Sequence, residues 1–482
     1  MKQTVLFLKS SVANDNVTVP YGTTWLSGLV FEALGLNAFL DTMKRDQGIK
    51  VSVVVKALVS FAIMGRGLSV LNIEYILSDP AVRMMYGLPD DIDRNDLYRC
   101  IKRMGLERYC VIRHINSVLK RRFGVRFVRT YIDWSTSYID GKSTAYIRFG
   151  HSKDHRPDRP QVSYGIALDA DAAVPIGLTV ERGNINDDIH FRRTFGVIER
   201  FLEPKASVTF DAGANGKVNT DMLNRRGYRF LTRVEINESD EKKLSSRDIE
   251  WTVLKDGTLA HRFEGNLGYT RTIFFSEKRK GEVIQSYWNK AERDYEKMLE
   301  MKKAIDLGHE PRKKYRSSNC FIATQFQLGG EYIGLSREAA IEAAVKNRIT
   351  GREGYFVLLS NWEEDEQETL DRYRHRNLSE DMYKDLKTGI RIRPIRSKNW
   401  IAVRGRIMIA YLALLVISFT RFMVPELRGR TAETIVDGLR LFSVTRISRE
   451  DGKFDLHYSN YSPMIKQIDE VFSSFPMYGK HV

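Results

Sequence analysis

A series of apolar, strand-length runs between residues 125 and 213 constrains the fold more than any other feature of this sequence. The runs are rich in β-branched and aromatic residues, and turn signals such as RPDRP and AGANG lie among them. They read VRFVRTYIDWS, QVSYGIALDAD, VPIGLTVERG and ASVTFDAG. MLNRRGYRFLTRV then has the pattern of a helix end followed by a strand. We therefore predict a mixed α/β sheet over residues 125–235.

The sequence before this sheet has the spacing of helices. Between residues 20 and 124, apolar side chains recur at three- and four-residue intervals in TTWLSGLVFEALGLNAFLDTM, VSVVVKALVSFAIM and RNDLYRCIKRMGLERYCVIRHINSVLKRRFG. Asp93 or Asn95 would suit the N-cap of the third stretch. Residues 1–124 are therefore predicted to form an all-α domain. Short helices that end in basic segments are typical of helix-turn-helix-like DNA-binding domains, although plain helical packing gives the same pattern.

The sequence after residue 235 indicates an interruption of the sheet. Residues 236–345 mix short strand-like pieces, WTVLKD, TRTIFF and CFIATQF, with one charged helix, GEVIQSYWNKAERDYEKMLEMKKAI. A strand-like sequence pattern resumes at GYFVLLSN. We predict a β-rich insertion over 236–345 and a second part of the sheet domain over 346–430. A C-terminal tail over 431–482 would hold a short helix at GLRLFSV and a weakly structured end.

The chain carries an excess of positive charge that bears on its partner. Its 76 Lys and Arg residues against 61 Asp and Glu residues give a net charge of +15, which favours a polyanionic partner. The basic residues recur in clusters, namely LKRRFGVRFVR, SEKRKG, PRKKYR, DRYRHR and RIRPIRSK. Each cluster alone would be an ordinary solvated surface, but together they indicate an extended track for an anionic polymer.

The cysteines and the hydropathy of the chain indicate its cellular compartment. Cys100, Cys110 and Cys320 form no CxxC pair and lie far from any His cluster with zinc spacing. This pattern favours a reducing compartment and argues against disulfides or structural zinc. The most apolar run, IMIAYLALLVIS, is shorter than the roughly 20 residues of a membrane span, and arginines flank it closely. We therefore predict a buried helix there and no membrane partner.

Three carboxylates form a candidate catalytic site. Asp133 ends the apolar run VRTYID, and Asp211 ends SVTFD. The end of a strand is a usual position for a catalytic or metal-binding carboxylate, although turns also favour Asp there. Glu380 follows on a predicted helix one strand later. Carboxylates with few nearby His or Cys suit Mg²⁺, and two such ions can activate a nucleophile and stabilise the leaving oxygen in attack on a phosphodiester.

The predicted helix around Glu380, YRHRNLSEDMYKDLK, has two distinct faces. Because a helix advances about 100° per residue, side chains at offsets of zero, three, seven and fourteen share one face; these are Tyr373, Arg376, Glu380 and Lys387. Leu378, Met382 and Leu386 fall on the opposite, core-facing side. The acidic run over 363–366 suits a helix N-terminus. For the polar face alone, the simplest interpretation is a solvated surface.

These residues, in this order, resemble the DDE triad of transposases with an RNase H-like fold. The four residues of the polar face match the Y-x2-R-x3-E-x6-K signature of bacterial insertion-sequence transposases at every spacing. The blocks GHSKDHRPDRPQVSYGIAL, GNIND and TFDAGANG are also similar to one subgroup of that class. The resemblance extends from about residue 125 to residue 421. It implies an α/β fold in which an RNase H-like mixed-sheet core carries a β-rich insertion and follows an all-α N-terminal domain.

The resemblance also implies an activity and its partners. Asp133, Asp211 and Glu380 would bind two Mg²⁺ or Mn²⁺ ions and catalyse phosphodiester cleavage at insertion-sequence ends and strand transfer into target DNA. Arg376 and Lys387 would hold phosphates beside the scissile bond, and Tyr373 would contact the DNA backbone. The implied partners are transposon-end duplex DNA, target DNA and a second copy of the chain in the synaptic complex. The implied location is the cytoplasm of a bacterium or archaeon, at the nucleoid.

Other interpretations of the same residues stay open. An RNase H-like structure-specific nuclease would use the same triad without strand transfer. A domesticated DNA-binding protein with a decayed catalytic centre would keep the fold, although the intact triad argues against decay. Trp134 and Trp362 could stack on an unpaired base at the cut, but core packing is the simpler interpretation of both.

Overall fold

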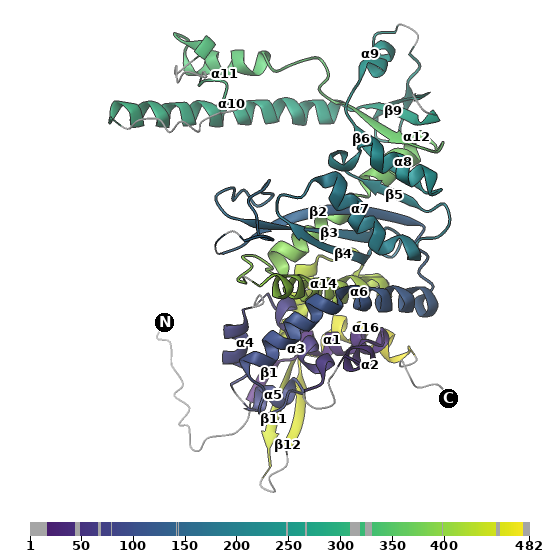
Figure 1. Cartoon of the computed structure of the whole chain (residues 1–482), viewed down its shortest axis with the longest axis vertical. Helices are drawn as coiled ribbons and strands as arrows, with labels where there is room; N and C mark the ends of the chain where they lie inside the picture. Colours follow the sequence, from purple (N-terminus) through teal and green to yellow (C-terminus); the bar gives the residue numbers. More distant parts are fainter. Residues whose placement is uncertain are drawn as a thin grey trace, which may run out of the picture. The chain divides into compact units, whose positions relative to one another are not determined.

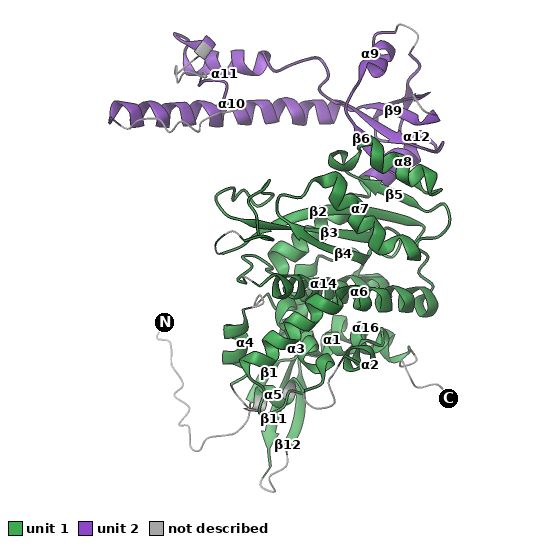
Figure 2. Cartoon of the chain, in the orientation of Figure 1, with its two compact units in different colours: residues 1–230, 374–482 green, residues 231–373 purple. Residues whose placement is uncertain are grey.

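We describe the protein from a computed structural model, whose chain divides into two compact units (Figure 2). Unit 1 comprises residues 1–230 and 374–482, and unit 2 comprises residues 231–373. The residues that the structure describes are 17–43, 49–65, 69–78, 80–140, 142, 144–246, 249–265, 268–308, 319–322, 330–397, 399–449 and 454–475.

Unit 1 contains a mixed sheet with strand order β4-β3-β2-β5. The strands are β2 (Arg129–Tyr138), β3 (Gln161–Asp169), β4 (Val174–Arg182) and β5 (Ser207–Phe210). The pairs β4–β3 and β3–β2 are antiparallel, whereas β2 and β5 are parallel. All four strands coincide with the predicted apolar runs. This mixed sheet, with helices packed on it, confirms the predicted α/β, RNase H-like core.

Helices cover the sheet of unit 1. Helix α7 (Asp187–Ile198) packs across β2, β3 and β4 (Figure 1). Asn186 caps this helix by accepting the backbone N–H of Asp188 at 2.8 Å. Helix α14 (Trp400–Met423) packs against β4 and also against α6 (Arg94–Phe123). The remaining elements near the sheet are η1 (Glu199–Phe201), η2 (Ala212–Ala214), α8 (Lys217–Arg225), α13 (Asn377–Lys384), the π-helical turn η5 (Asp385–Gly389) and η6 (Pro425–Leu427).

Helix α14 is the apolar run that we expected to be buried. It is 24 residues long, longer than the apolar run alone suggested, and in the described part of the chain it is the one helix long and apolar enough to cross a membrane by length and composition. Its most apolar window is 89% buried inside the protein. The predicted buried helix is therefore confirmed. Because nearly every face of α14 packs on protein, its hydropathy is explained by the core.

The contact between α6 and α14 depends on two glycines. A Cβ atom on Gly105 would lie 2.1 Å from the carbonyl oxygen of Ile401, and a Cβ atom on Gly405 would lie 1.7 Å from that of Ile101. Side chains at either position would force the helices apart. Glycine is therefore required at this crossing, which joins the N-terminal helices to the helix beneath the sheet.

The N-terminal part of unit 1 is helical, as predicted. Its helices are α1 (Gly22–Ala33), α2 (Leu36–Asp41), α3 (Val51–Ile63), α4 (Val70–Ile76), α5 (Pro80–Met85) and α6. Asp93 caps α6, as expected, in a capping box with Asp96. One short strand, β1 (Val17–Pro20), accompanies the helices.

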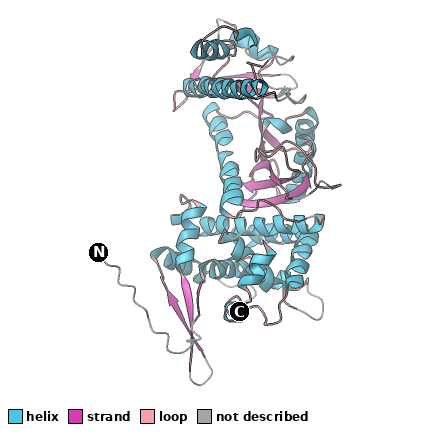
Figure 3. Ribbon diagram, turned by 90° about the vertical axis from the view of Figure 1, so that its left-hand side faces the viewer, coloured by secondary structure: helices cyan, strands magenta, loops and turns pink. Residues whose placement is uncertain are grey.

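The C-terminal segment is better ordered than we predicted. It forms α15 (Ala432–Leu441), β11 (Ser443–Ser448), β12 (Phe454–Ser459) and α16 (Pro463–Ser473). Strand β11 pairs with both β1 and β12, which makes a separate small sheet, drawn in magenta below the helices in Figure 3. The prediction of a weakly structured end is wrong because this segment completes a sheet with the N-terminal strand, a long-range pairing that local pattern does not reveal.

Unit 2 contains the strands β6 (Arg229–Val234, which starts in unit 1), β7 (Thr252–Val253), β8 (Leu259–Glu264), β9 (Thr270–Phe275) and β10 (Tyr355–Ser360). They follow the order β6-β10-β9-β8-β7, and each adjacent pair in this order is antiparallel. The helices are α9 (Glu238–Leu244), α10 (Glu277–Asp306), η4 (Gly330–Tyr332), α11 (Arg337–Lys346) and α12 (Glu366–Arg374).

Helices α10 and α11 form their own small core within unit 2, around Ala291, Phe321 and Ala344. The expected charged helix corresponds to α10, and the expected strand-like pieces WTVLKD and TRTIFF correspond to β7 and β9. Of CFIATQF, only residues 320–322 are described, and the basic cluster PRKKYR lies outside the described residues.

Candidate active site

Asp133 and Asp211 lie side by side on neighbouring strands. Ile132 of β2 pairs in parallel register with Phe210 of β5, and each aspartate is the next residue along its strand. Adjacent strands are about 4.8 Å apart. Asp211 follows β5 directly and caps η2, since its Oδ1 accepts the N–H of Ala212 at 2.9 Å. The structure therefore brings these two predicted site residues together.

Asp133 is buried, with 6% of its surface exposed. Its Oδ1 accepts the backbone N–H of Trp134 at 2.8 Å. Burial raises the pKa of the Asp133 carboxyl, and the positive charges of Lys153 and Arg376 oppose that rise. A carboxyl held this way favours a nearby cation, because a cation offsets the cost of a buried charge.

The helix predicted over Tyr373, Arg376, Glu380 and Lys387 is not continuous. Helix α12 ends at Arg374, α13 begins at Asn377, and Lys387 lies in the π-helical η5. The prediction of one straight polar face is therefore wrong. The physical reason is that the two halves bury different cores.

The two cores can be named from the residues on either side of the break. Tyr373 packs on the apolar cluster of unit 2, and Met382 and Leu386 are buried in unit 1, as predicted. Leu378, which we placed on the apolar face, is instead 36% exposed. The residues before the break therefore pack in unit 2, and those after it pack in unit 1.

Arg376 links the two carboxylates that lie on different elements. One of its terminal nitrogens lies 3.0 Å from Glu380 Oε1, and the other lies 4.0 Å from Asp133 Oδ2. The Arg376 side chain is 15% exposed, whereas that of Glu380 is 59% exposed. Glu380 therefore shares an arginine with Asp133, and its carboxylate has room to change rotamer.

Lys387 binds a buried aspartate. Its Nζ and a terminal nitrogen of Arg393 both lie 2.8 Å from Asp154 Oδ1, and the Asp154 side chain is fully buried. Burial lowers the pKa of the Lys387 ammonium, and Asp154 opposes that shift. The structure thus places Lys387 where it ties η5 to the loop that carries Asp154.

Tyr373 lies at the end of α12 in unit 2, where it packs with Trp362 on Leu231, Leu358 and Leu370. Trp362 and Trp134 are both packed side chains, as the simpler interpretation held: Trp134 is 3% exposed, and the Arg372 guanidinium lies 5.6 Å above the Trp362 ring.

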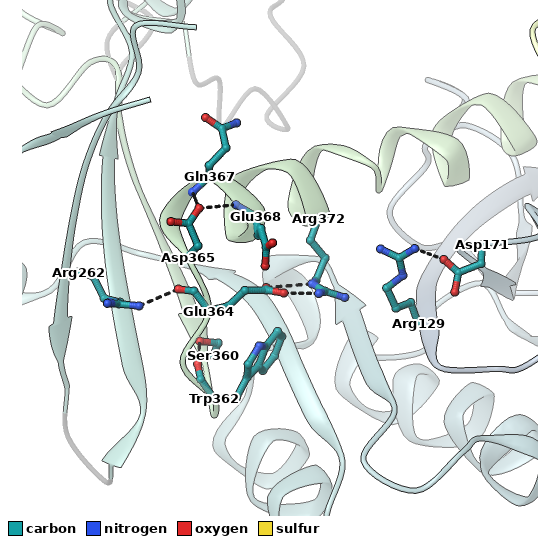
Figure 4. A network of polar contacts seen from close by, with 10 residues as sticks. All are labelled: Arg129, Asp171, Arg262, Ser360, Trp362, Glu364, Asp365, Gln367, Glu368 and Arg372. Atoms are coloured by element: carbon teal, nitrogen blue, oxygen red, sulfur yellow. Dashed lines mark hydrogen bonds and ion pairs between the residues drawn. The ribbon is translucent and has the colours of Figure 1, made fainter. Parts of the chain in front are cut away.

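The acidic run before α12 caps that helix, as predicted. Asp365 Oδ1 accepts the N–H groups of Gln367 and Glu368 at 2.8 and 3.2 Å (Figure 4). Glu364 forms an ion pair with Arg372, and its carbonyl accepts from Arg262 at 2.8 Å. The turn between β10 and α12 is therefore fixed by side chains of unit 2. Figure 4 also draws the separate ion pair of Arg129 and Asp171 in unit 1.

Sequence reasoning missed two residues that position Asp133. The Tyr383 hydroxyl donates to the carbonyl oxygen of Asp133 at 2.6 Å and accepts the N–H of Ile166 at 3.1 Å. Lys153 Nζ donates to the carbonyl oxygen of Trp134 at 2.6 Å. Both lie in segments already noted, Tyr383 in the helix of Glu380 and Lys153 in the block GHSKDHRPDRPQ, but spacing alone gave no partner for either.

A fourth carboxylate, Asp187, lies against the turn after Asp211. A Cβ atom on Gly213 would come within 2.7 Å of Asp187 Oδ2. The Trp134 side chain also hydrogen-bonds to Asp187, and burial raises the pKa of the Asp187 carboxyl. Gly213, in the block TFDAGANG, therefore allows GNIND to approach the Asp211 turn closely.

The donor set at this site suits a hard divalent cation. Asp133 and Asp211 present carboxylates from neighbouring strands, the ligand type that Mg²⁺ and Mn²⁺ prefer. Within the described ranges, no three His, Cys, Asp or Glu side chains gather closely enough to form a complete metal site. Glu380 is bound instead to Arg376 and would join the two aspartates only by turning from that arginine.

Comparisons with known proteins bear on the whole of this region. The family model described as a transposase DDE domain matches residues 128–416. A search of curated proteins finds no match. Among solved structures, the cryo-EM structure of a piggyBac transposase synaptic complex with hairpin DNA has a TM-score of 0.41 and 11% identity, over 88% of this chain and 79% of that one. That likeness is too distant to add to the family match. Because the matched residues make up more than half of the chain, the protein belongs to the family of transposases with a DDE domain.

Proposed function

We propose that this transposase cuts phosphodiester bonds at the ends of an insertion sequence and joins those ends to target DNA. The observation that carries the proposal is the register of β2 and β5, which sets Asp133 beside Asp211 at one end of the sheet. Paired carboxylates on adjacent strands suit metal-dependent phosphoryl transfer. Glu380 is the third member of the proposed triad. It forms an ion pair with Arg376, which also lies near Asp133.

The metal ions are proposed from the donor set and the family. Asp133, Asp211 and Glu380 would hold two Mg²⁺ or Mn²⁺ ions, which would supply an activated nucleophile and a stabilised leaving oxygen. The chain's own residues prepare the site. Tyr383 fixes the strand backbone at Asp133, and Arg376 lies where it can meet negative charge that develops beside Asp133 and Glu380.

The partners follow from the same proposal. They are duplex DNA at the transposon ends, target DNA, and a second copy of the chain when two ends are brought together. We also propose that the Y-x2-R-x3-E-x6-K residues belong to a bacterial or archaeal insertion-sequence enzyme that works at the nucleoid. In this chain Arg376 is the member of that set best placed to meet DNA near the triad, because Lys387 binds Asp154.

The experiment that tests this proposal measures nicking of a labelled duplex that carries the inverted repeat flanking the coding sequence. Wild type is compared with Asp133→Asn, Asp211→Asn and Glu380→Gln in Mg²⁺, in Mn²⁺ and in chelator. Each variant should fold and bind the duplex but lose nicking by several orders of magnitude, because the amide keeps the size of the side chain and removes the charge.

The matched control is Asp171→Asn, which removes a surface carboxylate paired with Arg129 and should leave nicking intact. Wild-type nicking that survives chelation would contradict the metal mechanism. Near-normal nicking in one variant would remove that residue from the triad. Joined products in a reaction with added target DNA would separate a transposase from a nuclease.

A further inference from the structure

An aromatic side chain is exposed on the loop between β2 and β3 of unit 1. This residue is Tyr146, and 51% of its surface is exposed. Its ring stacks on that of Trp400, the first residue of α14, with ring centroids 5.4 Å apart and planes 10° apart. Trp400 can cover only one face of the tyrosine ring, so the exposed surface includes the other face. An oriented, exposed aromatic ring is the kind of surface on which a nucleobase stacks.

The loop holds Tyr146 in a fixed position. Thr144 Oγ1 accepts the backbone N–H groups of Tyr146 and Ile147 at 3.3 and 3.2 Å. Ile147 is fully buried, so it anchors the turn in the core. The next residue, Arg148, is joined to β3, because its carbonyl oxygen accepts the N–H of Gln161 at 2.8 Å. The Tyr146 ring is therefore ordered before any ligand binds, which lowers the entropy cost of binding.

Arg404 places a positive charge beside this aromatic pair. Its guanidinium lies 4.8 Å from the centroid of the Trp400 ring. Among the described residues, Arg404 forms no ion pair, and its Nε has no hydrogen-bond acceptor. Glu181 attracts Arg404 through space, but its carboxylate is bound to Arg193. The guanidinium thus keeps hydrogen-bonding capacity that an anion could use.

The same loop is connected to the strand of the proposed triad. It begins after Tyr138, the last residue of β2, which lies five residues beyond Asp133. Further along the loop, Lys153 Nζ donates to the carbonyl oxygen of Trp134 at 2.6 Å. The segment that carries Tyr146 therefore leaves the strand of Asp133 and contacts it again. A DNA strand that reaches Asp133 has this loop beside it.

We propose that Tyr146, Trp400 and Arg404 form a site for single-stranded DNA. An unpaired base stacks on the open face of Tyr146, and Arg404 attracts a phosphate of the same strand. The start of α14, at Trp400, adds the positive end of a helix dipole, which also favours a phosphate. Bases inside a duplex are covered by their neighbours, so the site selects unpaired DNA. This inference rests on the proposed function for its choice of DNA, and it adds a contact that the triad does not require.

The test measures the affinity of the full-length protein for two labelled single strands of about 12 nucleotides. One strand is oligothymidylate, and the other has the same sugar-phosphate backbone without bases. The variants are Tyr146→Ala, Tyr146→Phe, which keeps the ring, and Arg404→Met, which keeps an apolar stem over Trp400. Tyr75→Ala removes a tyrosine that is 81% exposed elsewhere in unit 1 and is the matched control. Melting temperatures establish that each variant is folded.

Wild type should bind the strand with bases about tenfold more tightly than the strand without them. Tyr146→Ala should lose most of this preference, whereas Tyr146→Phe and Tyr75→Ala should keep it. Arg404→Met should weaken binding of both strands and lower the slope of log affinity against log salt by about 0.7, as expected for one phosphate of a single strand.

Equal affinity of wild type for the two strands would overturn the site, and so would an undiminished preference in Tyr146→Ala. A salt slope in Arg404→Met equal to that of wild type would remove the phosphate contact and overturn the site as proposed. Nicking of the end duplex is measured in parallel. Wild type that nicks but shows no base preference would overturn this site alone, whereas wild type that shows the preference but does not nick would overturn the proposed function alone.

Discussion

The Tyr383 hydroxyl donates a 2.6 Å hydrogen bond to the backbone carbonyl of Asp133, although the two residues are 250 positions apart in the chain. The same oxygen accepts the N–H of Ile166 on the neighbouring strand. Tyr383 therefore ties α13, the helix of Glu380, to the strand of Asp133. We expect the proposed triad to depend on this bond, because it joins the helix of one carboxylate to the strand of another.

Tyr383→Phe should separate positioning from folding. The change leaves a buried carbonyl and a buried N–H without their partner, which costs about 1–3 kcal/mol in the free energy of unfolding. We expect nicking to fall further than this loss explains, because α13 is no longer tied to Asp133. Chemical denaturation and nicking of the labelled end duplex measure the two effects.

Tyr164→Phe is the control for that experiment. Tyr164 is also buried and packs beside Tyr383, but its hydroxyl lies 3.2 Å from that of Ser137 and is not hydrogen-bonded to Asp133. It should lose comparable stability and keep most of its nicking. Equal losses of nicking in both variants would mean that Tyr383 only packs in the core and does not position the helix of Glu380.

Lys387→Ala should destabilise the fold. It leaves the fully buried Asp154 with Arg393 as its remaining recorded ion-pair partner, and breaking a buried pair costs about 3 kcal/mol or more. The double variant Lys387→Met with Asp154→Asn removes both charges and should recover most of the melting temperature. If nicking recovers with stability, Lys387 is structural. If stability recovers and nicking does not, Lys387 also contacts phosphate, as the sequence signature implies.

The core strands were predictable because their signal is local. Each run such as VRTYID or SVTFD carries its own β-branched content, and the sheet pairs these runs in the way an α/β core requires. The adjacency of Asp133 and Asp211 then follows from strand order and register.

The helix of Glu380 was predicted less well because its shape depends on tertiary packing. Residues 375 and 376 interrupt it, since the residues before the break bury in one core and those after it bury in another. Helical arithmetic assumes one straight axis. The partner of Lys387 was equally hidden, because nothing in the block around Asp154 indicates that its carboxylate faces a lysine more than 200 residues away.

The free energy of unfolding should fall as pH rises, because of the carboxyl of Asp169 at the end of β3. Burial raises the pKa of this carboxyl to about 7, above its usual value of about 3.9. The native state therefore binds the proton more tightly than the unfolded state. This contribution is full below about pH 4 and is lost as pH rises through about 7.

Asp169→Asn should remove that dependence. Wild type is expected to lose a few degrees of melting temperature more than the variant between about pH 5 and 8. Glu296→Gln, a change at an exposed carboxylate paired with Arg337, is the control and should follow wild type. Identical pH profiles for wild type and Asp169→Asn would contradict a raised pKa at this position.

Lys153→Met should impair catalysis more than folding. The Lys153 ammonium donates to the carbonyl of Trp134, lies 5.7 Å from the centre of that ring, and is the strongest charge that opposes the raised pKa of Asp133. Methionine keeps the apolar stem over Trp134 but loses both the donor and the charge. Asp133 then ionises less readily and the loop of Lys153 loses its anchor on β2, so we expect nicking to fall about tenfold or more, in the range of one lost charged contact.

Lys153→Arg decides whether this role is one of positioning. Arginine can still donate to the Trp134 carbonyl and keeps the charge beside Asp133, so it should restore a large part of the nicking that methionine loses. Lys297→Met, an exposed change on α10, removes one charge elsewhere and should leave nicking unchanged. If arginine and methionine reduce nicking equally while both variants melt like wild type, neither the charge nor the hydrogen bond matters, and Lys153 fills space beside Trp134 and no more.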